Sequence, residues 1–187
     1  YGKKGDIDLE KFKTKTREIL TELETQFGPF LHPALTIYGH GNGGMEYCGA
    51  TITSIYSLRH EITHSYFGRV VMPSDGDAGW IDEAITKWHD YMSSNEVLNE
   101  NLNLRMGNHS HYNRMTDTNA YYSGANLMGH FYFLMKNNWI STLRNLVDKF
   151  RFQSITNQQF ELYLEKSYGT ELPKRYKEYV YGTTQYS

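Results

Sequence analysis

Two histidines spaced four residues apart constrain this chain more than any other feature. His60 and His64 enclose Glu61 in the pattern His-Glu-x-x-His (HExxH), within a segment, residues 54–67, whose apolar side chains recur at helical spacing. On a helix, this spacing places both imidazoles on one face, one turn apart, where they can bind one zinc ion. Glu61 projects about 100° away from His60, so it can stay off the metal and activate the attacking water as a general base.

Glu83 is the candidate for a third ligand. A catalytic zinc ion uses three protein ligands and keeps one position open, and Glu83 follows His64 after the intervening residues 65–82. Residues 72–79 are rich in turn formers and a second helical pattern starts at Trp80, so two helices are expected to converge on the metal. The HExxH pattern alone also occurs on solvated helices that bind nothing. Here a third candidate ligand, the loop before it and the helix that carries it all agree, and together they favour one Zn²⁺ per chain.

The other histidines lack this paired spacing. We expect each to be a surface residue or a hydrogen-bonded core residue rather than a ligand. They are His32, His40, His89, His109, His111 and His130. His109 and His111 fall in a predicted loop, where adventitious metal binding is the alternative.

The composition excludes several classes of function. The chain has 187 residues, enough for a single core, and no apolar run of membrane-spanning length, so we expect a soluble protein without a membrane segment. Its 19 basic and 21 acidic residues give a net charge of -2, which argues against nucleic acid and anionic membranes as partners. The lone Cys48 excludes an internal disulfide and leaves the compartment open, and the oligomeric state is not determined. A start at Tyr1 without an apolar signal core predicts a chain that was processed or cut from a longer protein.

Hydrophobic periodicity predicts a mixed N-terminal third. Residues 8–27 form an amphipathic helical pattern that stops at Gly28-Pro29. Residues 35–38 and 45–53 are rich in β-branched and aromatic residues and flank a glycine-rich connection. We expect two strands there, followed by the helix that carries the two histidines.

The remainder of the chain has helical periodicity. Together with the mixed N-terminal third, this predicts an α+β fold. Residues 93–118 are polar and are expected to form an irregular surface loop. Helices are predicted at residues 80–91, 121–136, 140–150, 157–168 and 172–181. We therefore expect one domain, residues 1–187, with a small mixed β/α lobe over about 1–78 and a helical lobe over about 79–187.

Three motifs, taken in order, resemble those of the aminopeptidase N family of gluzincin zinc metallopeptidases. Gly43–Tyr47 (GGMEY), His60–Gly68 (HEITHSYFG) and Trp80–Ala84 (WIDEA) are similar to the family's GxMEN and HExxH-x18-E motifs. The resemblance covers about residues 38–126. It implies a thermolysin-like catalytic domain with two lobes.

The resemblance also implies roles on the substrate side. Glu46 would bind the free α-amino group of a peptide, and the backbone at Gly43 and Gly44 would line the substrate. A carboxylate just after a glycine pair, on a strand along a cleft, can meet an ammonium group while a peptide pairs alongside; the alternative for Glu46 is a solvent-facing strand residue. Tyr121, in a segment similar to the family's Tyr-x-x-Gly, would hydrogen-bond the tetrahedral oxyanion, with Tyr122 as its rival.

On the metal side, the resemblance implies the same ligands and base as the spacing: His60, His64, Glu83 and Glu61. The chain departs from the family at Tyr47 and Asp82, where Asn is usual, and at Ala84, where Gly is usual. Only 37 residues separate Glu83 from Tyr121. Full-length members also carry a β-rich domain before the catalytic one and often a helical domain after it, which implies here a stripped-down member with an open cleft or a catalytic fragment.

The leading hypothesis is therefore a zinc-dependent aminopeptidase, whose partner is a peptide or protein substrate. An endopeptidase with an open cleft keeps the same chemistry and is the first alternative. The second is a catalytically weak, zinc-bearing module that binds peptides. The intact Glu61 argues against a pure binding module, because binding needs no base beside the metal.

Overall fold

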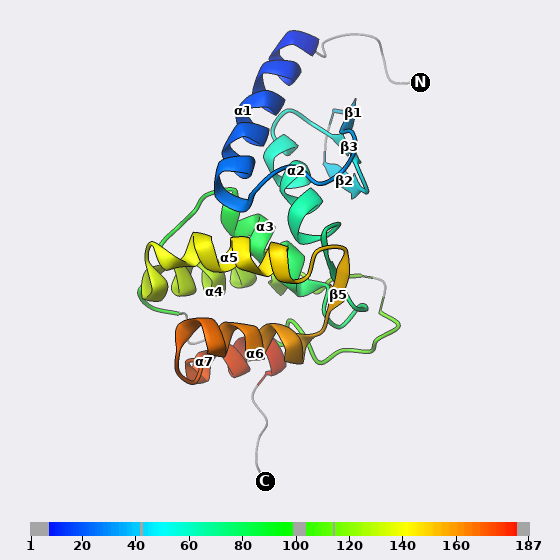
Figure 1. Cartoon of the computed structure of the whole chain (residues 1–187). Coiled ribbons are helices and arrows are strands. Elements are labelled where there is room, and N and C mark those ends of the chain that lie inside the picture. Colours follow the sequence, from blue (N-terminus) through cyan, green and yellow to red (C-terminus); the bar gives the residue numbers. More distant parts are fainter. Residues whose placement is uncertain (1–7, 42, 99–103, 114, 183–187) are drawn as a thin grey trace.

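The computed structural model describes residues 8–41, 43–98, 104–113 and 115–182 and combines helices with short strands (Figure 1). The elements in chain order are α1 (Leu9–Phe27), β1 (Thr36–Gly39), β2 (Gly44–Tyr47), β3 (Ala50–Thr53), α2 (Leu58–Phe67), β4 (Val71–Pro73), α3 (Trp80–His89), α4 (Asn119–Met135), α5 (Asn138–Lys149), β5 (Gln153–Ile155), α6 (Asn157–Tyr168) and α7 (Lys174–Tyr181). Each of the predicted helices is present, with ends that differ by a few residues. The mixture of helices and strands agrees with the predicted α+β class, while the division into two lobes near residue 78 stays a prediction.

Helix α1 begins and ends where the sequence predicts. The Asp8 carboxylate accepts a hydrogen bond from the backbone of Lys11 at 3.0 Å and caps the first turn. Gly28 ends the helix with φ +97°, a conformation that favours glycine. One face packs on α2 and α5 and buries Ile19, Leu23 and Phe27. The outer turns of α1 extend past the rest of the molecule (Figure 1).

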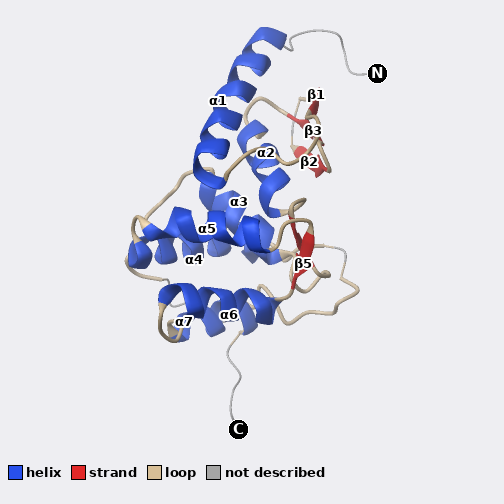
Figure 2. Cartoon of the chain, in the orientation of Figure 1, coloured by secondary structure: helices blue, strands red, loops and turns tan. Residues whose placement is uncertain are grey.

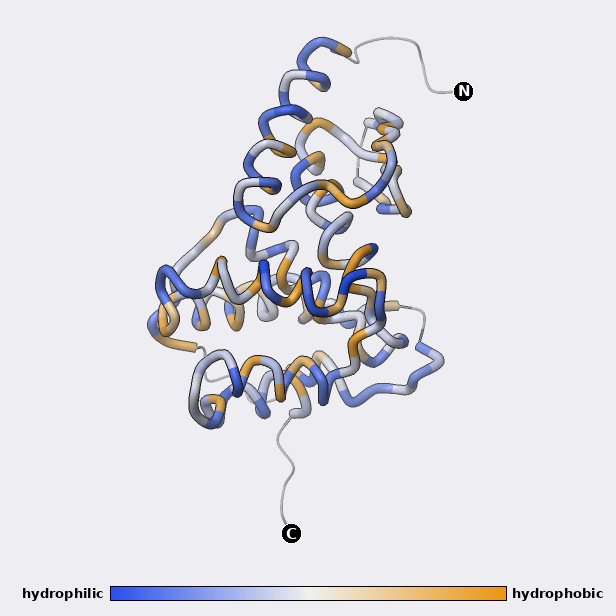
Figure 3. The backbone as a smooth tube through the Cα atoms, viewed as in Figure 1, coloured by the Kyte–Doolittle hydropathy of each residue, from blue (hydrophilic) through white to orange (hydrophobic). Residues whose placement is uncertain are grey.

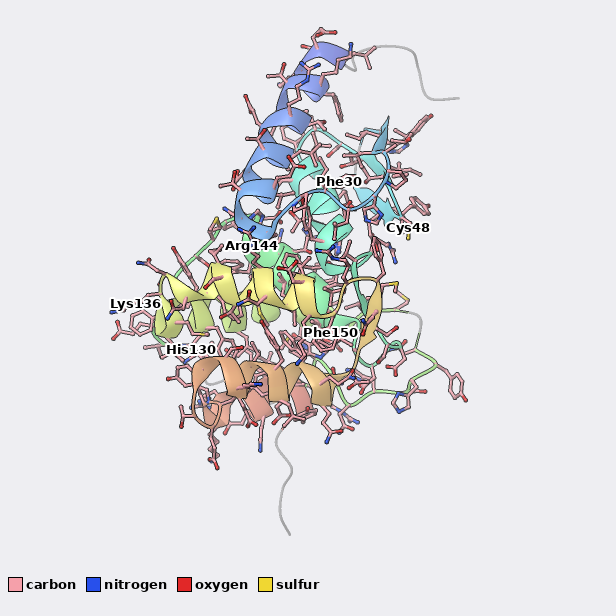
Figure 4. The ribbon with its side chains drawn as sticks, viewed as in Figure 1. Phe30, Cys48, His130, Lys136, Arg144 and Phe150 are labelled. Carbon is pink, nitrogen blue, oxygen red and sulfur yellow. The ribbon has the colours of Figure 1, made fainter. Side chains whose placement is uncertain are left out.

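The predicted strand over residues 45–53 is wrong in one respect, because it is a hairpin of two strands, β2 and β3. The chain reverses at Cys48-Gly49, where Gly49 has φ +67°. The sheet order is β1-β3-β2, with β1 parallel and β2 antiparallel to β3. Its strands gather beside α1 and α2 (Figure 2). The lone Cys48 is exposed near β2 and β3 (Figure 4).

Helix α2 runs through the centre of the molecule. It contacts α1, α3 and the sheet, and nearly every one of its residues is buried. Leu58, Ile62 and Tyr66 are at most 1% exposed and belong to the main core. The helix starts later than the predicted residue 54, since residues 55–57 form a turn. Because α2 is buried and tightly packed, side chains that point from it into a site are held in a fixed position.

Helices α3 and α4 pack more closely than any other pair. A methyl group built on Gly124 of α4 would lie 2.6 Å from the Cβ of Ala84 on α3, so the two backbones meet at these small residues. Around them lie large buried rings, among them Trp80, Trp88 and Phe131. In the molecule as a whole, apolar stretches alternate with polar ones along the helical segments (Figure 3). This packing fixes the start of α4 against the first turns of α3.

A two-stranded parallel sheet, β4 with β5, was not predicted. Val71 pairs with Gln153 and Pro73 with Ile155, so the chain after α2 is tied to the chain after α5. Each strand has three residues, too short for a periodic signal. Within the predicted polar loop of residues 93–118, residues 99–103 and 114 lie outside the described residues.

No helix in the described part of the chain combines the length and the apolar character needed to cross a bilayer.

His89 lies in the core and gives a testable pH dependence. The residue is 1% exposed, and its Nε2 lies 2.7 Å from Gln26 Oε1. Burial lowers the pKa of His89 to about 4, against an ordinary histidine value of about 6.5. The folded state thus binds fewer protons than the unfolded state between pH 6.5 and 4, and stability is lost as the pH falls through that window.

We expect the free energy of unfolding to fall, between pH 7.5 and 5, by about 2 kcal/mol more in the wild type than in His89→Gln. Urea denaturation of both proteins in EDTA at the two pH values measures the difference. Subtracting the change in the free energy of unfolding of one protein from that of the other cancels the contributions of groups that titrate in both. Equal pH dependence in the two proteins would show that His89 does not carry this effect.

Candidate metal centre and peptide cleft

Helices α2 and α3 bring three candidate metal ligands together. His60 and His64 lie one turn apart on α2, and Glu83 lies in the first turn of α3, which packs against α2. His60 Nε2 and His64 Nε2 are 3.3 Å apart, and Glu83 Oε2 lies 3.4 Å from the first and 3.5 Å from the second. The three atoms form a nearly equilateral triangle.

This triangle fits a zinc ion. Ligand atoms at about 2.0–2.1 Å from a tetrahedral zinc ion lie about 3.3–3.4 Å from one another. Glu83 Oε2 is buried and has no hydrogen-bond partner among the described residues. A buried carboxylate oxygen is costly unless it meets a positive charge or a metal. The donor set of two imidazoles and one carboxylate is that of catalytic zinc sites with one open position.

Asp90 orients the first histidine and was not predicted from the sequence. Its Oδ2 lies 3.1 Å from His60 Nδ1, which lets the ring donate from Nδ1 and keep Nε2 free for a metal. Lys87 Nζ donates to the same oxygen at 3.1 Å. Burial alone lowers the pKa of His60, but Asp90 and Glu83 raise it to about 10. Asp90 follows Glu83 by about two helical turns, and this spacing is the signal that could have identified it.

The second histidine is held between α2 and α3. His64 is 1% exposed, with Asp82 Oδ2 at 3.7 Å and Thr86 Oγ1 at 3.5 Å from its Nδ1. Burial raises the pKa of Asp82 to about 7. Asp82, one of the departures from the family motif, therefore lies directly beside a candidate ligand.

Glu61 lies beside the candidate metal ligands and is only 6% exposed. Its carboxylate packs against Gly44 of β2, where an added methyl group would overlap Glu61 Oε1. Burial raises the pKa of Glu61 to about 7, against the opposing influence of His60 and His64. A carboxyl group that titrates near neutral pH is suited to taking up and releasing a proton.

The candidate ligands line a cleft of about 780 Å³. Gly43, Gly44 and Glu46 line it on the side of β2, which stands at one end of the strand order β1-β3-β2. A terminal strand leaves backbone groups available to pair with an extended peptide. Glu46 is half-buried, and its Oε1 accepts a hydrogen bond from Arg69 at 2.6 Å.

Tyr121 lies at the candidate metal ligands and Tyr122 does not. The Tyr121 hydroxyl donates to Glu83 Oε1 at 3.0 Å, and the side chain lines the cleft. Tyr122 is 72% exposed, with Lys87 Nζ 5.4 Å from its ring centre. Successive residues point about 100° apart on a helix, so only one of the two can face the ligands.

The remaining histidines lie away from these ligands. His32 contacts the backbone oxygen of Ser65 at 3.0 Å. His111 lies on the surface, 3.0 Å from Asp75, and with Asp77 it forms a second group whose potential ligand atoms lie within 4.8 Å of one another. This group, of which only His111 is exposed, lies outside the cleft.

Solved structures share this fold. An M1 zinc metallopeptidase from Deinococcus radiodurans matches with a TM-score of 0.75 and 16% identity, over 100% of this chain and 47% of that chain. A leukotriene A4 hydrolase from Saccharomyces cerevisiae matches with a TM-score of 0.69 and 16% identity, over 86% and 32%. An aminopeptidase A from Legionella pneumophila matches with a TM-score of 0.67 and 16% identity, over 91% and 24%. No protein-family model matches the sequence, and no curated protein does.

The architecture is thus one that zinc metallopeptidases adopt. More particularly, it is the fold found in M1 zinc metallopeptidases. The chain spans less than half the length of each of these structures, and its likeness to them is one of fold.

Proposed function

We propose that the chain is a zinc-dependent peptidase that hydrolyses peptide bonds at free N-termini. The observation that carries this proposal is the triangle of ligand atoms from His60, His64 and Glu83, with Glu61 beside it and β2 along the same cleft. One structure of the D. radiodurans metallopeptidase has a bound Tyr-Ser-Ala substrate, and short peptides are the substrate class proposed here. Residues 1–187 would act as one catalytic domain with one zinc ion.

Glu61 is the proposed general base. When bound, zinc would supply polarisation of the scissile carbonyl and a lowered pKa for the attacking water. Glu61 takes the proton from that water and passes it to the leaving amine. Its place beside the ligands, against the bare backbone of Gly44, leaves its carboxylate within the cleft. The Tyr121 hydroxyl donates to the carbonyl oxygen as that oxygen becomes an anion.

Glu46 is the proposed acceptor for the substrate's ammonium group. It lies on β2, close to the ligands, where an extended peptide pairing with the strand would end. A charge-assisted hydrogen bond there would select substrates with a free N-terminus. Gly43 and Gly44 leave room for the peptide backbone.

The proposed activity is tested with paired substrates. Aminoacyl fluorogenic substrates and their N-acetylated forms are compared on the zinc-loaded protein, together with internally quenched peptides blocked at both ends. We expect hydrolysis of the free forms only. Equal cleavage of acetylated substrates would favour the endopeptidase alternative, and no hydrolysis of any substrate would favour the binding module.

Zinc content provides a separate prediction. After zinc loading and desalting, the wild type should retain about one equivalent and His64→Ala less than about 0.2, because losing a ligand weakens affinity by orders of magnitude. Elemental analysis measures both values. His130→Ala serves as the control, because His130 lies outside the cleft and contacts the backbone of Asn95. Undiminished zinc in His64→Ala would refute the assigned ligand set.

Tyr121→Phe should lower kcat by about a hundredfold with little change in KM, because the phenol acts chiefly once the oxyanion forms. Tyr122→Phe is the matched control, since the neighbouring ring is exposed, and it should keep wild-type kinetics. Steady-state kinetics on one aminoacyl substrate distinguish the two. If Tyr122→Phe loses activity while Tyr121→Phe keeps it, Tyr122 and not Tyr121 donates to the oxyanion.

A further inference from the structure

Arg69 forms an ion pair with Glu46 that the sequence motifs do not foretell. Arg69 follows the end of α2, and its Nη2 donates both to Glu46 Oε1 at 2.6 Å and to the Glu46 backbone oxygen at 3.1 Å. Both side chains are largely shielded, at 31% and 20% exposed. The pair therefore ties the strand that lines the cleft to the helix that carries the histidines.

Holding Arg69 against Glu46 costs free energy, which indicates that the contact has a function. Its Nε is buried and has no hydrogen-bond partner in the part of the chain that the structure describes. Arg69 is absent from the residues that line the cleft, whereas Glu46 is among them. Arg69 thus acts on a ligand in the cleft only through Glu46.

The contact with Arg69 restricts how the Glu46 side chain can lie, because the guanidinium meets Glu46 at two points, Oε1 and the backbone oxygen. A guanidinium that contacts both the carboxylate and the backbone of one residue restricts its side chain to a narrow range of rotamers. Glu46 Oε1 is committed to Arg69, which leaves Oε2 for a second cation.

We propose that Arg69 is a positioning residue that gives the site its selectivity for a free N-terminus, by holding Glu46 with one carboxylate oxygen open to the ammonium group of the substrate. The inference rests on the proposed function of Glu46. It adds the residue that makes Glu46 an effective acceptor, and it predicts that the preference for a free N-terminus weakens when Arg69 is replaced although Glu46 is intact.

The experiment compares Arg69→Gln, Arg69→Lys and Glu46→Gln with the wild type on free and N-acetylated aminoacyl substrates. We expect Arg69→Gln to raise KM for the free substrates about tenfold, the change expected for one charge-assisted hydrogen bond, with kcat altered less than about twofold. The substitution should leave the zinc content and the rate on acetylated substrates at their wild-type values. Arg69→Lys, which keeps one charged donor, should recover part of the loss. Arg151→Gln removes an exposed ion pair with Asp148 and is the control.

A double variant tests whether Arg69 works through Glu46. In the Glu46→Gln background, Arg69→Gln should have no further effect on KM. Calorimetric titration of leucine hydroxamate and its N-acetyl form repeats the comparison without turnover. Additive effects, or equal losses on free and acetylated ligands, would overturn the inference while leaving the aminopeptidase proposal in place. A wild type that does not discriminate free from acetylated substrates would overturn both.

Discussion

Glu61→Gln is expected to lower kcat by about a hundredfold or more while the protein keeps its fold and its zinc. The amide has the shape of the carboxylate but cannot accept the proton of the attacking water. Because Glu61 is buried against Gly44 and surrounded by the ligand helices, glutamine fits the same space without rearrangement. Initial rates at saturating substrate, elemental analysis and a melting curve measure the three quantities.

The control for Glu61→Gln is Glu10→Gln, which removes a carboxylate from an exposed pair with Lys13 on α1. It should leave kcat unchanged. A Glu61→Gln protein that retains more than about a tenth of the wild-type rate would assign the proton transfer to another group. Loss of zinc in this variant would instead make Glu61 part of the metal site.

Gly44→Ala is expected to lower kcat by about tenfold to a hundredfold although it replaces no ionisable group. The new methyl group would overlap Glu61 Oε1, so either the base swings away or β2 moves outward. Displacement of a catalytic group by about 1 Å is sufficient for losses of this size. Kinetics together with zinc content distinguish this effect from damage to the metal site.

Gly41→Ala is the matched control for Gly44→Ala. It lies in the same glycine-rich segment and has no positive φ, and apart from its chain neighbours no heavy atom of the described residues lies within 4 Å of the added methyl group. We expect wild-type kinetics. If Gly44→Ala is also fully active, the carboxylate of Glu61 works from a different position than the one in this structure.

The convergence of the three candidate ligands could be predicted because helical geometry converts spacing into position. A spacing of four residues between two histidines fixes their relation on any helix, and the turn-rich loop before Trp80 allows Glu83 to return to them. The family resemblance favoured Tyr121 over Tyr122, but spacing alone could not decide between them, because it does not show which face of a helix meets a neighbouring helix. The contact of α4 with α3 at Gly124 decides that orientation.

Other features depend on contacts between distant segments and leave no local pattern. Arg69 meets Glu46 only once β2 lies against the end of α2. The pairing of β4 with β5 joins segments some 80 residues apart. The hairpin of β2 and β3 was within reach of sequence reasoning, since Gly49 interrupts the apparent strand at a turn.

The burial of α2 couples metal affinity to folding. Because this helix contributes both candidate histidine ligands and a large share of the core, it cannot melt locally and leave a competent site behind. Any ion that binds only the folded chain raises its stability by mass action, by about 4 kcal/mol at a free concentration a thousand times its dissociation constant. The midpoint of thermal denaturation, followed across a series of buffered zinc concentrations, therefore reports the affinity of the site without a substrate or a spectroscopic probe.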